Sequence, residues 1–181
     1  MGASTTLLTF EEFERLPDRP GKRELLKGEL IELPPAESIH NRIAERIRDG
    51  LRAALAEAHA RREAADLGET FHEMGYQLGV EAWVQPDASI THAGQPEEKY
   101  FAGAPAIAVE VISPGNTAES IDVKTALYFQ FGAREVWMVY PKTRHIDIHV
   151  PGGSRVFTAL QFVTTPLLPA LALPVAEILG E

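Results

Sequence analysis

An apolar run that contains one carboxylate constrains the fold of this chain more than any other stretch. Residues 106–112 read AIAVEVI, a run rich in β-branched residues, and Glu110 lies inside it. Such a near-continuous apolar run is typical of a central strand that is covered on both faces. Burying an ionised carboxylate without compensation is costly. We therefore expect Glu110 to lie beside a metal, a cation or strong hydrogen-bond donors, or else to titrate.

A second carboxylate, Asp87, raises the same question. It lies in residues 83–90, which read WVQPDASI, directly after Pro86. The missing N–H and the restricted geometry of proline favour a strand edge or a bend at this point. A side chain at such a point can be aimed out of the regular strand ladder. Asp87 is therefore a candidate for the same site as Glu110.

The segment after the apolar run predicts a helix that carries a lysine on its buried face. Asn116 followed three residues later by Glu119 approximates a capping box, so we expect the helix over about residues 117–131. Lys124 lies on the same stripe as the apolar residues that recur at helical spacing, namely Ile121, Leu127, Tyr128 and Phe131. A lysine facing a sheet with two carboxylates suits a site that holds a scissile phosphate beside a divalent cation.

These stretches resemble the PD-(D/E)xK nuclease superfamily, in which an Asp after Pro, a second strand with Glu and a nearby lysine form the site. The order RELLKGEL, WVQPDASI, AVEVISPGNTAESIDVK and GAREVWMVYP is similar to that of the Uma-two family of restriction-endonuclease-like proteins. The resemblance runs from LTFEEFERLPD to LLPALALPVAEIL. It implies an α/β (α+β) restriction endonuclease-like fold, with a mixed central β-sheet flanked by helices and an N-terminal helix and hairpin.

The resemblance also implies an enzyme, a metal-dependent endodeoxyribonuclease, and its site residues. Asp87, Glu110 and Lys124 would be catalytic, and Glu24 would add an acidic group from the first elements of the chain. Asp87 and Glu110 would bind Mg²⁺, for which Mn²⁺ can substitute, together with the backbone carbonyl of Val111.

One position departs from the superfamily pattern. An E-x-K motif would place a lysine at position 112, where this chain has Ile112, so Lys124 would have to supply the lysine from the helix. The resemblance implies such a relocated lysine. For Glu24 the residues alone favour another interpretation, a solvated charge on an exposed strand.

Composition indicates one domain over residues 1–181. The chain has 45% apolar residues, which is enough for one well-packed core at this length. It has no cysteine, which excludes disulfides and thiolate metal sites. We see no apolar run of membrane-spanning length and no signal-peptide pattern, so we expect the protein in the cytoplasm.

Net charge opposes broad electrostatic attraction to nucleic acid. The formal charge is −9, whereas Lys and Arg contacts to phosphate supply most non-specific affinity. A local basic face is still possible, because basic residues crowd two segments: Arg15, Arg19, Lys22 and Arg23, and then Arg42, Arg46, Arg48, Arg52, Arg61 and Arg62. The expected partner is nucleic acid, with DNA preferred over RNA. By analogy we also expect a two-fold homodimer, which would place one site on each strand.

Periodicity and turn residues predict the remaining elements. They are a short helix that begins at a Thr9–Glu12 capping box, a hairpin over residues 22–33, a helix over residues 38–65, paired strands over residues 71–80 and 82–90, and strands over residues 135–140 and 144–150. His40 is expected at the surface. In the last strand His145, Asp147 and His149 alternate, which permits a metal site but is more simply the polar face of a half-buried strand.

Three hypotheses for function follow. The first is a Mg²⁺-dependent nuclease, the second a nuclease-like domain that only binds nucleic acid or a protein, and the third a buried structural ion pair of Glu110 with Lys124. Asp87 discriminates among them, because two carboxylates and one lysine leave a net negative charge that suits a hard divalent cation. The chain has no Walker, dinucleotide-binding, serine-hydrolase or metalloprotease motif.

Overall fold

A six-stranded mixed sheet forms the centre of the protein. The computed structural model describes residues 7–180. The strand order is β11 (Gly153–Thr158), β10 (His145–Val150), β9 (Glu135–Tyr140), β8 (Ile107–Val111), β6 (Ala88–His92) and β3 (Leu67–His72). β8 and β9 are parallel, and the other neighbours are antiparallel. All five residues of β8 are buried, which confirms the central strand expected from the apolar run.

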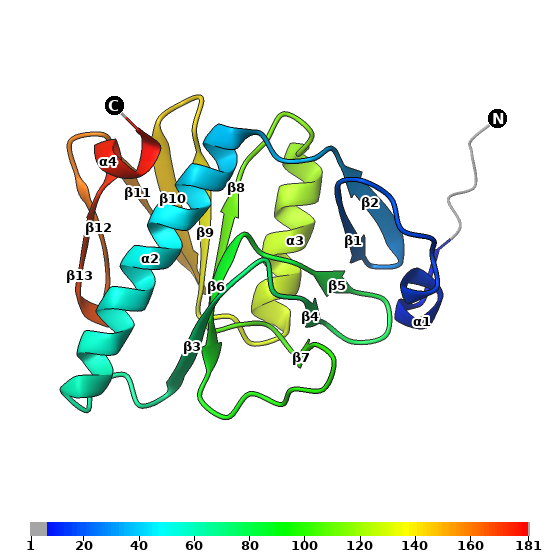
Figure 1. Ribbon diagram of the computed structural model, residues 1–181, viewed down its shortest axis with the longest axis horizontal. Coiled ribbons are helices and arrows are strands. Elements are labelled where there is room, and N and C mark those ends of the chain that lie inside the picture. Colours follow the sequence, from blue (N-terminus) through cyan, green and yellow to red (C-terminus); the bar gives the residue numbers. More distant parts are fainter. Residues whose placement is uncertain (1–6, 181) are drawn as a thin grey trace.

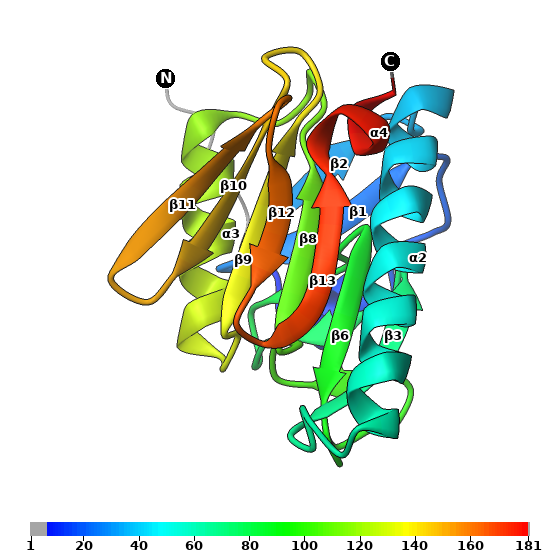
Figure 2. The ribbon, with the colours of Figure 1, turned by 90° about the vertical axis from the view of Figure 1, so that its left-hand side faces the viewer.

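Two long helices cover the opposite faces of this sheet (Figure 1). On one side lie α2 (Ser38–Ala60), α4 (Val175–Leu179) and the hairpin of β12 (Phe162–Thr165) and β13 (Leu168–Pro174), as Figure 2 also shows. On the other side lies α3 (Ala118–Gln130), which connects the parallel strands β8 and β9. This arrangement is the mixed sheet flanked by helices that the sequence predicts.

The alternation of side chains along β8 decides where Glu110 points. Val109 and Val111 belong to the apolar core under α2, whereas Ala108 belongs to the core under α3. Because successive side chains of a strand point to opposite faces, Glu110 faces α3. The carboxylate therefore lies on the same side of the sheet as Lys124.

A second, smaller sheet lies on the α3 side, in the order β2 (Glu29–Leu33), β1 (Lys22–Leu26), β5 (Trp83–Val84), β4 (Tyr76–Gln77) and β7 (Phe101–Ala102). β1 and β2 form the expected hairpin, in register from Lys22 opposite Leu33. Its turn residues Lys27 and Gly28 both have positive φ, as a tight hairpin turn requires. α1 (Phe10–Glu14) precedes the hairpin and begins at the expected Thr9–Glu12 capping box.

The predicted pairing of residues 71–80 with residues 82–90 is confirmed, but the pair is not continuous and is divided between the two sheets. Each segment contributes to both sheets: β3 pairs with β6 in the large sheet, and β4 pairs with β5 in the small one. The break in the second segment falls at Gln85 and Pro86, because proline has no N–H to continue the ladder. This break places Asp87 where the two sheets meet.

Two helix boundaries also differ from the prediction. α3 is capped by Thr117 and Ser120, not by Asn116 and Glu119, and Asn116 instead accepts a hydrogen bond from the Ser113 N–H at 2.8 Å. The expected bounds of this helix are nevertheless correct within about one residue. α2 ends at Ala60, because Arg62 and Ala64 adopt positive φ and cannot continue a helix.

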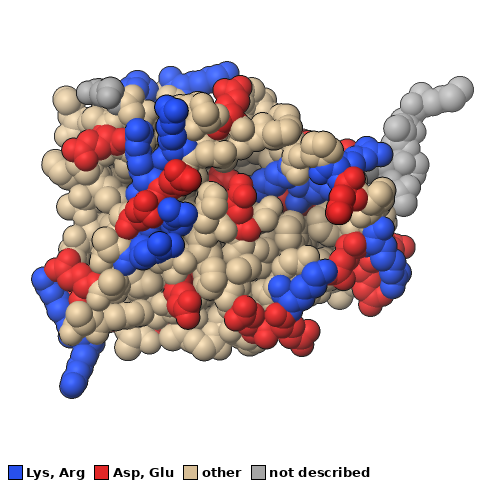
Figure 3. Space-filling view, viewed as in Figure 1, with Lys and Arg blue, Asp and Glu red and all other residues tan. Residues whose placement is uncertain are grey.

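Two arginines of the basic segment over α2 and its C-cap are paired with acidic residues. Arg48 pairs with Asp49 at 2.8 Å, and Arg61 pairs with Glu57. On the face that Figure 3 shows, Lys and Arg alternate with Asp and Glu. No helix in residues 7–180 is long and apolar enough to cross a membrane.

Candidate active site

Asp87 lies between the two sheets, directly before the start of β6. Its N–H donates to the Val109 carbonyl at 2.9 Å, and its Oδ2 accepts a hydrogen bond from the Val111 N–H at 2.7 Å. The side chain is buried, with 1% of the residue exposed. Asp87 therefore lies against the end of the strand that carries Glu110, as the sequence predicts.

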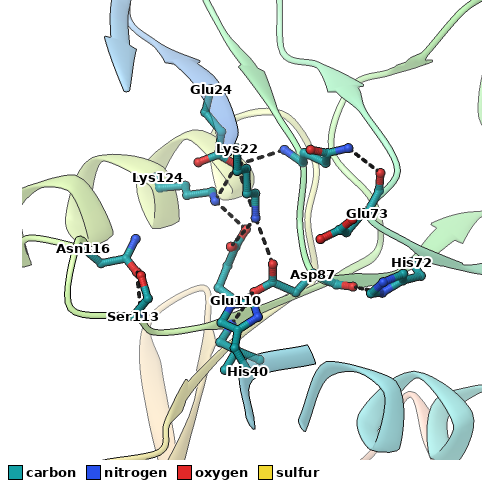
Figure 4. A network of polar contacts seen from close by, with 12 residues as sticks. Lys22, Glu24, His40, His72, Glu73, Asp87, Glu110, Ser113, Asn116 and Lys124 are labelled. Atoms are coloured by element: carbon teal, nitrogen blue, oxygen red, sulfur yellow. Dashed lines mark hydrogen bonds and ion pairs between the residues drawn. The ribbon is translucent and has the colours of Figure 1, made fainter. Parts of the chain in front are cut away.

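Lys124 joins Glu110 to Glu24, as Figure 4 shows. The Lys124 Nζ lies 2.7 Å from Glu110 Oε1 and 2.7 Å from Glu24 Oε1. Glu24 comes from β1 and also accepts a hydrogen bond from the Gln85 N–H at 3.0 Å. With only 2% of the residue exposed, Glu24 is no solvated strand charge, so that interpretation is wrong.

Lys22 is a fifth charged residue of the site, and sequence analysis did not assign it there. Its Nζ lies 2.9 Å from Asp87 Oδ1, 3.7 Å from Glu110 Oε2 and 3.9 Å from Glu24 Oε1. A signal was available, because Lys22 and Glu24 are two residues apart on β1 and so share a face. The ammonium of Lys22 thus lies within 4 Å of all three carboxylates.

His40 and Tyr128 complete the polar contacts of the site. The His40 Nε2 lies 3.3 Å from Asp87 Oδ2, so the expectation that this histidine is a surface residue is wrong. Its other ring nitrogen, Nδ1, is buried without a hydrogen-bond partner. The Tyr128 hydroxyl donates to Glu110 Oε1 at 2.6 Å and fixes that carboxylate from the buried side of α3.

The pKa values of the two central carboxylates, Asp87 and Glu110, are shifted in opposite directions. Although burial alone would raise it, the pKa of Asp87 is held well below its usual value by Lys22, by His40 and by the Val111 N–H. Burial raises the pKa of Glu110, against the opposing effect of Lys124 and Lys22. Two titratable groups whose environments drive their pKa values apart are typical of catalytic sites.

Asp87 and Glu110 lie at the floor of a pocket of about 460 Å³, which Glu24 and Lys124 do not line. Lys22, Asp87 and Glu110 line its bottom, and the connections β2–α2, β8–α3 and β9–β10 form its walls. Asp87 and Glu110 are therefore buried yet open to a ligand on one side.

The donor set fits a small hard cation. The oxygens of Asp87 and Glu110 are the ligands that Mg²⁺ prefers. The ammonium of Lys22 already holds a positive charge between these carboxylates and stands in for such an ion. Across residues 7–180 no group of three or more His, Cys, Asp or Glu side chains could hold a metal ion as the side chains stand. We attribute this to the two lysines, which lie between the carboxylates.

The fold and this group of residues define a nuclease-like class of protein, built on a mixed sheet with two carboxylates on adjacent strands and a lysine on the covering helix. Within that class, the chain belongs to the Uma2 family, described as "Putative restriction endonuclease", whose model matches residues 10–176. A crystal structure from Anabaena variabilis, titled as a "putative nuclease belonging to DUF820", is similar with a TM-score of 0.79. It shares 19% identity, with 95% of this chain and 97% of that chain covered, and it confirms the fold. A comparison with curated proteins found no match.

Proposed function

We propose that the protein is a Mg²⁺-dependent endonuclease that hydrolyses phosphodiester bonds of nucleic acid, with DNA as the expected substrate. Membership of the Uma2 family supports the nuclease class. The observation that carries the proposal is the cluster of Glu24, Asp87, Glu110, Lys22 and Lys124, of which Lys22, Asp87 and Glu110 line one pocket. Three carboxylates and two lysines from separate elements exceed what a structural ion pair needs.

Asp87 and Glu110 would hold the ion, together with the carbonyl of Val111. A bound Mg²⁺ supplies a water of lowered pKa and neutralises charge that develops on the phosphate. The Val111 N–H fixes Asp87, and the Tyr128 hydroxyl fixes Glu110, so both carboxylates are preorganised. Mn²⁺ is expected to substitute for Mg²⁺.

Lys124 would act on the reacting phosphate. Glu24 and Glu110 hold its ammonium at 2.7 Å each, on the side of Glu110 that faces α3. From there the ammonium can orient the attacking water and stabilise negative charge on phosphate oxygens. Glu24 is then a positioning residue for Lys124, and Ile112 needs no catalytic role.

One observation favours the second hypothesis, a domain that binds without cleaving. Lys22 and Lys124 already offset two of the three carboxylate charges, so the site is satisfied without a metal. The expected two-fold dimer also stays a prediction, which light scattering tests.

Cleavage of labelled DNA tests the proposal. The parent protein should cut DNA with Mg²⁺ or Mn²⁺ and lose activity in EDTA. Glu110→Gln should lower the single-turnover rate by about 100-fold or more, because it removes a metal ligand and its charge. Glu119→Gln on the exposed first turn of α3 is the matched control and should cleave like the parent. Equal rates for parent and Glu110→Gln would contradict the proposed site.

A further inference from the structure

We propose that the substrate of this site is an unpaired nucleotide, in a single strand or a bulge, and not a regular duplex. This inference rests on the proposed nuclease function. We expect one nucleotide to enter the pocket so that its phosphate reaches Asp87 and Glu110 at the floor.

The first argument for an unpaired nucleotide is that the site lies below the surface. Glu24, Asp87 and Glu110 are 2%, 1% and 5% exposed, whereas Ile39 at the pocket wall is 41% exposed. A reacting phosphate must therefore descend below the surface to meet the carboxylates. In a regular duplex each base is stacked and paired, so a whole nucleotide can enter the pocket only after it has unstacked and unpaired.

The walls of the pocket suit a base and a sugar. Its volume of about 460 Å³ falls in the range of pockets that enclose a small ligand. Leu33, Ile39 and Ile112 line it together with prolines of three loops, so much of the wall is apolar. Apolar and stacking contacts hold unpaired bases without reading their sequence.

The positive groups of the pocket lie where a phosphate would be. Lys22 is at the floor, and Lys142 lines the wall. The first turn of α2 borders the same pocket through Ile39 and His40, and its N-cap, Glu37, makes no side-chain capping bond. Because the Glu37 carboxylate also lines the pocket, this helix N-terminus adds little attraction for an anion beyond that of the two lysines.

The face of the molecule that Figure 3 shows does not offer the continuous basic surface that duplex binding requires. The net charge is −9, and on that face Lys and Arg alternate with Asp and Glu, while Arg48 pairs with Asp49 and Arg61 with Glu57. Phosphate neutralisation over a duplex needs many Lys and Arg contacts. A single nucleotide in a pocket needs few, which the described residues supply.

Three substrates of one sequence test the inference: a single strand, the matched duplex, and a duplex with one bulged nucleotide. With Mn²⁺, the single strand and the bulge should be cut at least about tenfold faster than the duplex, because pairing opposes entry into the pocket. Equal or faster cleavage of the duplex would overturn the inference and leave the nuclease proposal standing.

Binding separates the two proposals if no substrate is cut. Fluorescence anisotropy with Lys124→Ala and Mn²⁺ measures affinity for the same labelled strands in the absence of cleavage. Tighter binding of the single strand would support the pocket assignment even though the nuclease proposal had failed. Equal or tighter binding of the duplex would overturn the assignment of the pocket to an unpaired nucleotide.

A substitution that fills part of the pocket tests whether the nucleotide binds there. Ile39→Trp narrows the pocket at its wall and should lower kcat/KM for the single strand by about tenfold, chiefly through KM. Leu160→Trp, at a residue 97% exposed, is the control and should leave kcat/KM unchanged. Unchanged kcat/KM in Ile39→Trp, at an unchanged melting temperature, would contradict the assignment of this pocket.

Discussion

Replacing Lys22 by Met should destabilise the protein without divalent cations and strengthen its binding of Mn²⁺. Lys22 contacts Asp87 at 2.9 Å and lies within 4 Å of Glu24 and Glu110. Its removal leaves three buried carboxylates with Lys124 and His40, and breaking a buried ion pair in this way costs about 3 kcal/mol. A divalent cation that no longer competes with the ammonium should then bind more tightly and restore stability by linkage.

Thermal unfolding and calorimetry check this expectation. The melting temperature of Lys22→Met should fall below that of the parent in EDTA, and the rise on adding Mn²⁺ should be larger than in the parent. Lys142→Met, at the exposed wall of the same pocket, is the control and should change neither quantity. If Lys22→Met binds Mn²⁺ no more tightly than the parent, the ammonium does not hold the cation position.

Lys124→Ala should lower the single-turnover rate of cleavage by about 100-fold or more while the variant still binds Mn²⁺. The ammonium that bridges Glu24 and Glu110 is the group placed to stabilise charge on the phosphate. Its removal takes away a competing cation, so the affinity for Mn²⁺ should stay the same or rise. Lys99→Ala is the control, because Lys99 pairs with Glu14 at an exposed site.

A second substitution refines this prediction. Ile112 lies two residues after Glu110, so its side chain points to the same face, and it lines the same pocket. Ile112→Lys added to Lys124→Ala should therefore restore part of the turnover. In the parent background Ile112→Lys should mainly lower stability, because it places another ammonium against apolar groups. Parental rates in Lys124→Ala would show that this lysine is only structural.

Local sequence patterns predicted the central residues of the site. The apolar run identified β8 and the buried position of Glu110, and Pro86 marked the break at Asp87. Helical spacing placed Lys124 on the buried face of α3, where it is 5% exposed. Each of these inferences depends on neighbours within a few residues, for which sequence periodicity is informative.

Contacts between distant segments were not predictable in the same way. Lys22 meets Asp87 across 65 positions, and the path of β1 beside the large sheet is set by tertiary packing. The same holds for His40. Its helix, α2, covers the face of the large sheet opposite to α3, yet the His40 ring reaches Asp87. Strands as short as β4 and β5 carry too few residues for alternation to show where the predicted strands break between the two sheets. The corrected site therefore has two more basic groups than the sequence predicted.

A crystal structure with bound Mn²⁺ tests the central claim most directly. Anomalous scattering should give a peak about 2.1 Å from carboxylate oxygens of both Asp87 and Glu110. The Lys22 ammonium should have moved away from the 2.9 Å contact with Asp87 Oδ1. If saturating Mn²⁺ gives no peak there and the Lys22 contact stays at 2.9 Å, the carboxylates form a structural ion-pair network and the proposed metal-dependent nuclease site is wrong.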